Sequence, residues 1–329
     1  MNLAPQGHSK DIESMRQSDT FIEILSPQLI KLNPLIMREV DDLQKRLGLD
    51  IGWHYILGLI WILKLIQPSH GMKILDAGAG KGVLQFVMAE RGASILSVDF
   101  NYRRFPLHLR MGYEISYSGS SHLEHPYLEH LSRRHQDASN RLRLLRSQVL
   151  RVLYASVRLT RAGISAPGNW LMRRLGRRNP GGIVLYTCDM VEMNRISSGS
   201  VDSVVSLSAI EHMAPEDIKR AYKEFWRIVR PGGRIAITTN ASNSEDWYHQ
   251  PSKAWCFSES SIRELFHLGA QVPSNWSNYP ESMGQIRNSR ELRSRLSPSY
   301  RLSGQNGMPW GEWQPSYLPV GIMIERARE

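Results

Sequence analysis

Two acidic residues, Asp76 and Asp99, lie where runs of apolar residues end, and glycines at 78, 80 and 82 follow the first of them. Glycines at alternate positions let the backbone come close to a ligand, because no Cβ stands in between. An acid about twenty residues after such a turn can accept hydrogen bonds from the hydroxyls of a ribose. Residues 73–100 therefore predict a strand, a glycine turn, a helix and a second strand, arranged to bind a nucleoside-like ligand.

The spacing of the glycines separates two kinds of nucleoside ligand. A dinucleotide site has the pattern G-x-G-x-x-G, in which the third glycine allows close helix packing. Counted from Gly78, that third position is Val83, and the residues from Asp76 onward read D-x-G-x-G-x-G instead. The turn therefore argues against a nicotinamide dinucleotide.

The D-x-G-x-G-x-G turn resembles the first motif of the class I S-adenosylmethionine-dependent methyltransferases, and the resemblance continues along the chain. Asp189 follows a third predicted strand, the segment 200–213 contains a Glu-His pair, and Arg-Pro-Gly-Gly at 230–233 precedes another strand. The last two motifs are most similar to the small-molecule "type 11"-like subfamily. The resemblance covers 71–100 and 182–240. It implies an α/β, Rossmann-like sheet that is mostly parallel, with seven strands and an antiparallel last strand.

The resemblance also implies S-adenosyl-L-methionine as the cofactor, held beyond the carboxyl ends of the strands. Asp76 would orient the glycine loop or bind the amino group, Asp99 would hold the ribose, and Asp189 would accept from the adenine amine. Phe100 and Met190 would pack against the adenine. The complete expected cofactor site is Asp76, Gly78, Gly80, Gly82, Asp99, Phe100, Asp189, Met190, Ser206 and Ser208.

Methyl transfer from a sulfonium is an in-line displacement, so alignment of the reactants is the main task of the protein. A base is needed when the acceptor is a hydroxyl or a protonated amine. Glu211 and His212 follow the fourth expected strand of the resemblance, and His249 lies in the loop after the fifth. These three are the candidate catalytic residues, with His54 more distant. The alternative is that Glu211 and His212 begin a helix and only orient the cofactor.

Two sequence motifs that would indicate particular acceptor substrates are absent from the chain. The segment 206–209 reads Ser-Leu-Ser-Ala, without the Asn/Asp-Pro-Pro-aromatic motif of enzymes that act on base amines. Neither Cys188 nor Cys256 follows the fourth or fifth strand, as a nucleophile for methylation of a pyrimidine carbon would. The similarity of the last two motifs to the small-molecule subfamily implies a small-molecule, sugar or lipid-linked acceptor, methylated at oxygen.

Length and hydrophobic pattern divide the 329 residues into three parts. Residues 1–70 are expected to form an N-terminal helical cap, with an apolar stripe that begins at Phe21 and Ile24. Residues 71–329 are expected to form the methyltransferase domain. A basic helical insertion interrupts it at about 112–180, because the third strand does not begin until Ile183.

The insertion carries the excess positive charge. The chain has a net charge of +10, and residues 101–180 contain fifteen arginines and no lysine. Leu142, Leu145 and Val149 form one face of an amphipathic helix there. Three interpretations stay open: a helical lid, a peripheral contact with an anionic membrane surface, or binding of nucleic acid, which is the less favoured partner.

The remaining predictions concern the cellular location, metal binding and the alternative functions of the protein. Two cysteines and a polar start without a secretory pattern indicate a cytoplasmic protein, with the inner face of a membrane as its place if the insertion binds lipid. Four histidines between 122 and 135 are interrupted by Pro126 and lack a nearby cysteine, so no metal is expected. Two alternative functions remain: an RNA methyltransferase that uses the basic insertion, and a non-catalytic protein that binds the cofactor. The oligomeric state cannot be predicted.

Overall fold

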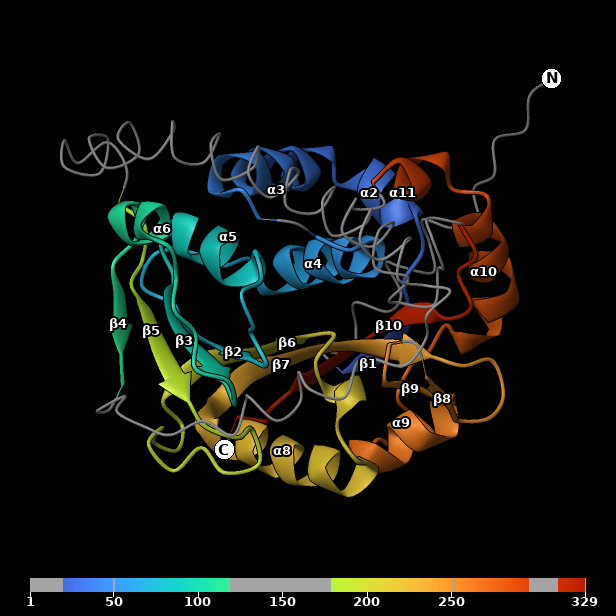
Figure 1. Ribbon diagram of the computed structural model, residues 1–329. Helices are drawn as coiled ribbons and strands as arrows, with labels where there is room; N and C mark the ends of the chain where they lie inside the picture. Colours follow the sequence, from blue (N-terminus) through green and yellow to red (C-terminus); the bar gives the residue numbers. More distant parts are fainter. Residues whose placement is uncertain (1–19, 50, 119–178, 251, 296–312, 329) are drawn as a thin grey trace, which may run out of the picture.

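A mixed sheet runs through the residues that the computed structural model describes, which are 20–49, 51–118, 179–250, 252–295 and 313–328. Within these residues it has ten strands, in the order β1-β10-β7-β6-β2-β3-β5-β4, with the β8–β9 hairpin beside β7 (Figure 1). The strands are β1 (Phe21–Ile24), β2 (Lys73–Ala77), β3 (Ser94–Asp99), β4 (Ile115–Tyr117), β5 (Ile183–Thr187), β6 (Val201–Leu207), β7 (Val229–Ala241), β8 (Trp247–His249), β9 (Ala254–Phe257) and β10 (Leu318–Glu325).

The central strands are parallel, and their carboxyl ends meet at one edge of the sheet. β2 pairs with both β3 and β6, β3 pairs with β5, and β6 pairs with β7, each in parallel. β10 is antiparallel to β7, which confirms the predicted antiparallel last strand. Seven strands were predicted, and the described residues form ten, because β1, β4 and the β8–β9 hairpin join the six strands that the sequence located.

Helices cover both faces of the sheet (Figure 1). α3, α4 and α5 lie on one side, and α8 and α9 lie on the other. Parallel strands need such crossover helices, and a sheet covered on both faces carries near-continuous apolar strands. The helical segments are α2 (Gln28–Leu32), α3 (Pro34–Leu47), α4 (Trp53–Ile66), α5 (Leu84–Glu90), α6 (Leu107–Gly112), η4 (Ile210–His212), α8 (Pro215–Ile228), α9 (Glu259–Leu265), η5 (Trp276–Asn278), α10 (Tyr279–Arg287) and α11 (Arg290–Ser294).

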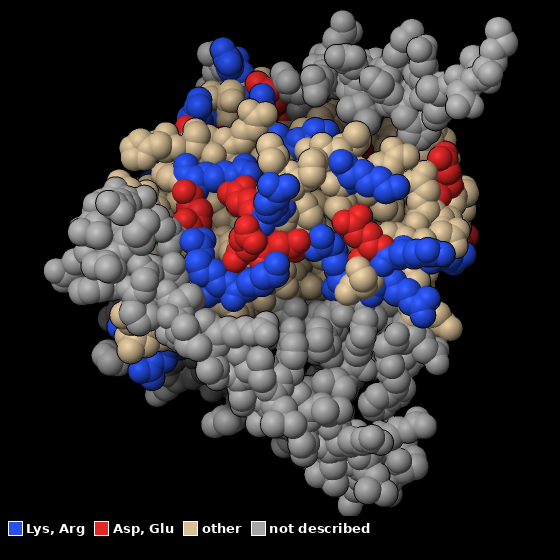
Figure 2. Space-filling view, turned by 90° about the horizontal axis from the view of Figure 1, so that it is seen from above, with Lys and Arg blue, Asp and Glu red and all other residues tan. Residues whose placement is uncertain are grey.

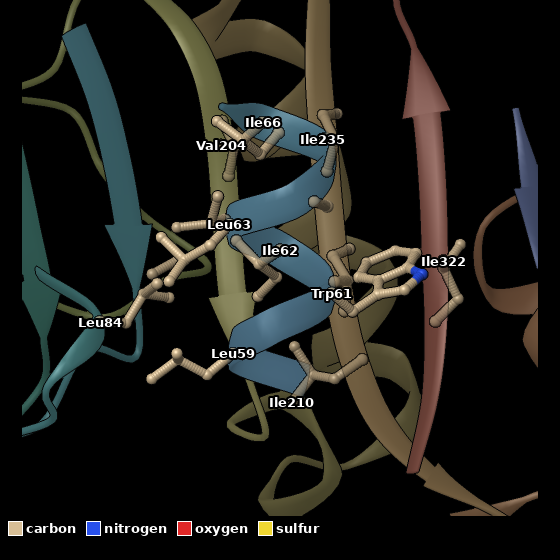
Figure 3. Close-up of a cluster of buried hydrophobic side chains, with 14 of the residues drawn as sticks. Leu59, Trp61, Ile62, Leu63, Ile66, Leu84, Val204, Ile210, Ile235 and Ile322 are labelled. Atoms are coloured by element: carbon tan, nitrogen blue, oxygen red, sulfur yellow. The ribbon is translucent and has the colours of Figure 1, made fainter. Parts of the chain in front are cut away.

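α4 is the central helix of the hydrophobic core. It is apolar on nearly every side, as expected for a helix with the sheet on one face and further helices on the other. Trp61 lies over β10, where a Cβ at Gly321 would come within 2.5 Å of the indole ring, so only glycine fits there. The indole Nε1 donates to Oε2 of Glu23 at 2.8 Å, which links α4 to β1. Figure 3 shows Leu59, Ile62, Leu63 and Ile66 packed among Leu84, Val204, Ile210, Ile235 and Ile322.

The predicted helical stripe at Phe21 and Ile24 was wrong. Phe21–Ile24 is a strand whose alternate residues, Ile22 and Ile24, are buried, and it pairs antiparallel with β10. Four residues are too few to separate a helix period from a strand period, and Pro27 ends the segment. Residues 20–70 are therefore part of the main sheet and its helical layer, not a separate cap.

The insertion begins later than predicted in the described part of the chain. Ile115–Tyr117 forms β4, which pairs in parallel with β5 at the edge of the sheet. The rest of the predicted insertion, 119–178, lies outside the described residues, as do its histidines and its amphipathic helix. Across the described helices, none is both long and apolar enough to cross a membrane.

Candidate active site

The loop after β2 has the backbone conformation that its glycines predict. Gly78 and Gly80 have φ angles of 71° and 51°, in the left-handed region that favours glycine. A Cβ at Gly78 would lie 2.4 Å from the Cβ of Ala209, so the loop also passes too close to the end of β6 for any side chain. The Gly80 N–H donates to Oδ2 of Asp99 at 2.9 Å, which ties the loop to the end of β3.

A buried arginine that the sequence analysis did not identify supports this loop from below. Arg103 is 3% exposed, and its guanidinium donates to the carbonyl of Gly80 at 3.1 Å. It also donates to the hydroxyl and carbonyl of Ser97 in β3, at 2.6 and 2.5 Å, and to the carbonyl of Tyr186 in β5 at 3.3 Å. Arg103 therefore joins the glycine loop to two strands with a single side chain.

Gln85 supports the same loop from the first turn of α5. Its side-chain amide donates to the carbonyl of Gly82 at 3.1 Å and accepts from the Ser97 hydroxyl at 2.8 Å. Asp76 lies beside this network and is 2% exposed. Burial raises the pKa of Asp76 to about 7, while Arg103 lowers it and Asp99 raises it further. The loop is thus held by a polar network under its main chain.

Two neighbouring cavities open above the loop. The smaller, of about 310 Å³, lies along the glycine turn, and the larger, of about 630 Å³, extends toward β6 and α8. Tyr55, Gly78 and Ser208 line both, so the cavities adjoin. Of the predicted residues, Asp76, Gly78, Gly80, Gly82 and Ser208 line the smaller cavity, and Gly78, Asp99, Phe100, Asp189, Met190, Ser208 and His212 line the larger.

The predicted adenine-binding residues lie together in the larger cavity. Phe100 is 69% exposed, unusually high for a phenylalanine, so its ring is available to a planar ligand. Met190 also lines this cavity, and its sulfur would be 3.5 Å from a Cβ at Gly78. Oδ1 of Asp189 accepts from the N–H of Val191 at 3.1 Å. An aromatic ring, a thioether and a carboxylate thus surround one end of the cavity.

The two predicted serines at the end of β6 differ in position. Ser208 lines both cavities and has a φ of 47°, and its N–H donates to the carbonyl of Thr238 at 3.1 Å. A serine at positive φ stores backbone strain, which is common at functional sites. The expectation for Ser206 was wrong: it is fully buried inside the sheet and lines neither cavity. Ser206 lies within β6, whereas Ser208 follows the end of that strand at Leu207.

His212 is the candidate base that reaches the larger cavity. It ends the short helix η4 after β6, and its ring is exposed. Nδ1 lies 2.8 Å from the main-chain carbonyl of Lys253. A carbonyl oxygen can only accept, so Nδ1 carries the hydrogen and donates. In the neutral ring Nε2 then holds the lone pair and can accept a proton.

Glu211 lies under the site and not in it. It is 2% exposed and lines neither cavity. Burial raises the pKa of this carboxyl to about 6, while His212 and the hydroxyls of Thr239 and Ser208 lower it. Among the described residues its Oε2 has no hydrogen-bond partner within normal distance. Glu211 therefore acts on the ligand only through the residues above it.

His249 and His54 do not line either cavity. His249 is 6% exposed in β8, its Nδ1 lies 2.6 Å from the hydroxyl of Ser252, and burial lowers its pKa. His54 in α4 has a pKa lowered to about 3, first by burial and then by the nearby His212. Both rings contact Tyr317, in an aromatic cluster behind the site. In this structure His249 is thus poorly placed to be the base.

A family model described as "Methyltransferase domain" matches residues 146–237. The matched segment contains β5, β6 and α8 but not the glycine loop. A ubiquinone biosynthesis O-methyltransferase from Leptothrix cholodnii is 43% identical over 47 residues, which is 14% of this chain and 20% of that protein. The match thus spans about a fifth of the length of this relative.

Solved structures of low sequence identity also align with the chain. A 1,6-didemethyltoxoflavin-N1-methyltransferase from Burkholderia thailandensis, solved with S-adenosylhomocysteine, is 12% identical, with 99% of this chain and 93% of that chain covered and a TM-score of 0.39. A geranyl diphosphate C-methyltransferase from Streptomyces coelicolor is 15% identical, with coverages of 90% and 78% and a TM-score of 0.34. TM-scores of this size give no information about the substrate of this chain.

The parallel sheet with its antiparallel β10, the glycine loop and the matched segment define a nucleoside-binding methyltransferase fold. The family match over residues 146–237 and the glycine loop support a class I S-adenosylmethionine-dependent methyltransferase, with S-adenosylmethionine as its cofactor.

The residues of the site fit that cofactor. A Cβ at Gly80 would meet only Oδ2 of Asp99, at 4.0 Å, so the space between loop and carboxylate is open. Each oxygen of Asp99 accepts one backbone N–H, from Gly80 and Asn101. A carboxylate offers about four acceptor positions, so two remain for the hydroxyls of a ribose. Phe100 and Met190 would then pack on the adenine and the glycine loop would face the methionine portion.

Proposed function

We propose that the chain transfers a methyl group from S-adenosylmethionine to a hydroxyl of a small-molecule, sugar or lipid-linked acceptor. The observation that carries the proposal is the ring of His212, which lines the larger cavity with Nδ1 bonded to a main-chain carbonyl and Nε2 left as a proton acceptor. A hydroxyl must lose its proton when it is methylated, so it needs such a base, whereas an acceptor atom that carries no proton does not. The position and tautomer of this side chain therefore support an oxygen target.

When bound, S-adenosylmethionine supplies a methyl group on a positively charged sulfur. His212 would take the proton of the acceptor hydroxyl at Nε2, so that the oxygen could accept the methyl group that the cofactor supplies. Asp99 and the glycine loop fix the direction of approach, because an in-line displacement depends on alignment. Tyr55 of α4 lines both cavities.

The relative from Leptothrix cholodnii, an O-methyltransferase by its description, supports an oxygen target for this chain, although the shared segment is short. The larger cavity of about 630 Å³ has room for part of the cofactor and a small acceptor. Peripheral contact with an anionic membrane through the arginine-rich insertion stays a proposal, because 119–178 lies outside the described residues.

The test is turnover. Purified protein with S-adenosylmethionine is offered panels of phenols, sugars and lipid extracts, and S-adenosylhomocysteine is measured by mass spectrometry. We expect product with a hydroxyl acceptor, and a His212→Gln variant should lower kcat about 10²- to 10⁴-fold while it still binds S-adenosylhomocysteine. Methylation of an RNA, or binding without any turnover, would contradict the proposal in favour of the two alternative functions.

A further inference from the structure

The β8–β9 hairpin reaches from the edge of the sheet to the ring of His212. β8 and β9 pair antiparallel, with His249 opposite Ala254, and β9 pairs with the end of β7. At the turn, the N–H of Lys253 donates to the carbonyl of Gln250 at 3.2 Å. The carbonyl of Lys253 accepts from Nδ1 of His212 at 2.8 Å. A loop more than forty residues away in sequence thus contacts the candidate base.

The backbone of Lys253 is held in an unusual conformation at this contact. Its φ is 53°, in the left-handed region that lysine rarely adopts. Such a residue persists only where its surroundings fix it. The hydroxyl of Ser252, one residue earlier, bonds to Nδ1 of His249 at 2.6 Å, which anchors the turn to β8. The strained residue and its anchor together determine where the carbonyl points.

We propose that Lys253 is a positioning residue, whose main-chain carbonyl holds His212 in the Nδ1–H tautomer and so keeps Nε2 as the proton acceptor. The inference rests on the proposed function, in which His212 is the base. It also gives His249 a role: the imidazole supports the turn that carries the carbonyl. The lysine side chain has no part in this role, since only its backbone conformation and its oxygen are used.

The structure offers a closely matched pair of positions for the test. His267, after α9, has a φ of 54° and donates its N–H to the carbonyl three residues earlier at 3.2 Å, as Lys253 does. It lines neither cavity. Proline at either position forces φ to about −65° and removes the N–H. Lys253→Pro and His267→Pro therefore impose the same backbone change, but only the first moves the carbonyl beside His212.

The first measurement is the tautomer of His212 in the folded protein by ¹⁵N NMR of its ring, assigned with His212→Gln. We expect the Nδ1–H form in the wild type and in His267→Pro, and a mixture of both tautomers in Lys253→Pro. Lys253→Gly should keep the Nδ1–H form, because glycine adopts a positive φ without strain. A wild-type ring in the Nε2–H form, or an unchanged tautomer in Lys253→Pro, would overturn the inference.

The second measurement separates this inference from the proposed function. With an acceptor in hand, Lys253→Pro should lower kcat at least about tenfold with little change in KM, and Lys253→Gly should recover most of it. If the tautomer changes as expected but His212→Gln retains full activity, the positioning is correct and the role of His212 as base is wrong. If kcat falls in Lys253→Pro with the tautomer unchanged, the carbonyl is not the cause.

Discussion

At the scale of single residues, Asp99 connects the glycine loop to the position expected for the ribose. Its two oxygens accept from Gly80 and Asn101 at 2.9 and 2.8 Å, and it still faces the larger cavity. A carboxylate accepts hydrogen bonds more strongly than a neutral amide does. The charge of this side chain therefore matters to the ligand as well as to the loop.

Asp99→Asn should weaken binding of S-adenosylhomocysteine about 10- to 100-fold, because hydrogen bonds to a charged group contribute about 1.5–3 kcal/mol. Isothermal titration calorimetry measures the affinity. Asp202→Asn is the matched control: Asp202 also accepts a backbone N–H, from Lys73 at 2.7 Å, but lies at the opposite ends of the strands. Equal affinities in both variants would remove Asp99 from the cofactor site.

Gly78→Ala should lower the affinity for S-adenosylhomocysteine at least about tenfold, because the new Cβ would lie 2.4 Å from Ala209 and the loop must move. Gly199→Ala is the control for backbone strain, since Gly199 has a φ of 62° and no atom within 4 Å of its added Cβ. The control should lose about 1 kcal/mol of stability and bind normally. The comparison by calorimetry and urea unfolding tests whether contact with β6, and not strain alone, requires glycine.

Glu211 should make stability depend on pH in a defined direction. Its carboxyl titrates near 4.5 in the unfolded chain and near 6 in the folded protein, because burial raises the pKa. The folded state therefore binds the proton more tightly, and the free energy of unfolding falls by up to about 2 kcal/mol as the pH rises through this window. Glu211→Gln should match the wild type below pH 4.5 and exceed it at pH 8 in urea unfolding. The exposed Glu216→Gln serves as control, and a Glu211→Gln variant that is less stable at pH 8 would contradict the assignment.

At the scale of elements, Arg103 links the glycine loop, β3 and β5. Arg103→Met should lower the free energy of unfolding by on the order of 2–4 kcal/mol, because the carbonyls of Gly80, Ser97 and Tyr186 lose their shared donor. It should also weaken the binding of S-adenosylhomocysteine through the loop. Arg104→Met, at the exposed neighbouring position, should change neither quantity. Chemical unfolding and calorimetry on the two variants provide the comparison.

Helices and strands could be predicted from the sequence where their hydrophobic pattern was regular and the segment was long enough to show it. α4 lies within the segment that was expected to be helical, and its fourteen apolar-rich residues follow Gly52. β10 and the parallel strands around the glycine loop were also predicted correctly. β1 was not, because a four-residue strand has no period of its own and depends on β10 for its identity. The pairing of β1 with β10 in the folded protein, and not its own sequence pattern, makes this segment a strand.

The candidate site was less predictable than the fold. Residues at strand ends could be assigned from the glycine motif, since strand ends of a parallel sheet meet at one edge. Arg103 could not, because its partners are mostly main-chain carbonyls that no side-chain pattern marks. The contact between His212 and Lys253 depends on where the β8–β9 hairpin lies. His249 was expected near the methyl position and instead supports that hairpin.

At the scale of the whole molecule, the charges of the described surface are largely balanced. Figure 2 shows basic and acidic side chains interspersed over the face that carries α3. Several are paired there, including Arg91 with Glu39, Arg46 with Glu90 and Arg295 with Asp41. These partly exposed pairs leave no single-sign field on this face. The excess charge of the chain is therefore expected in the segment 101–180.

Neutralising that segment should abolish binding to anionic vesicles. Changing Arg173, Arg174, Arg177 and Arg178 to glutamine should weaken sedimentation with phosphatidylglycerol vesicles at least about tenfold, since each basic residue near such a surface contributes about 1 kcal/mol. The control makes the same change at the exposed Arg38, Arg287, Arg290 and Arg293. Phosphatidylcholine vesicles and a structured RNA are the comparison ligands. Equal effects of the two variants, or tighter binding to RNA, would contradict the membrane proposal.

The place of β1 in the sheet has a consequence for biosynthesis. The strand that β1 pairs with along its length is β10, which is the last strand of the described chain and lies between β1 and β7. A nascent polypeptide therefore releases β1 and the apolar α4 long before the strand that covers them leaves the ribosome. Until β10 has been synthesised, these surfaces remain open to aggregation, so we expect newly made chains to depend on chaperones more than refolded ones do.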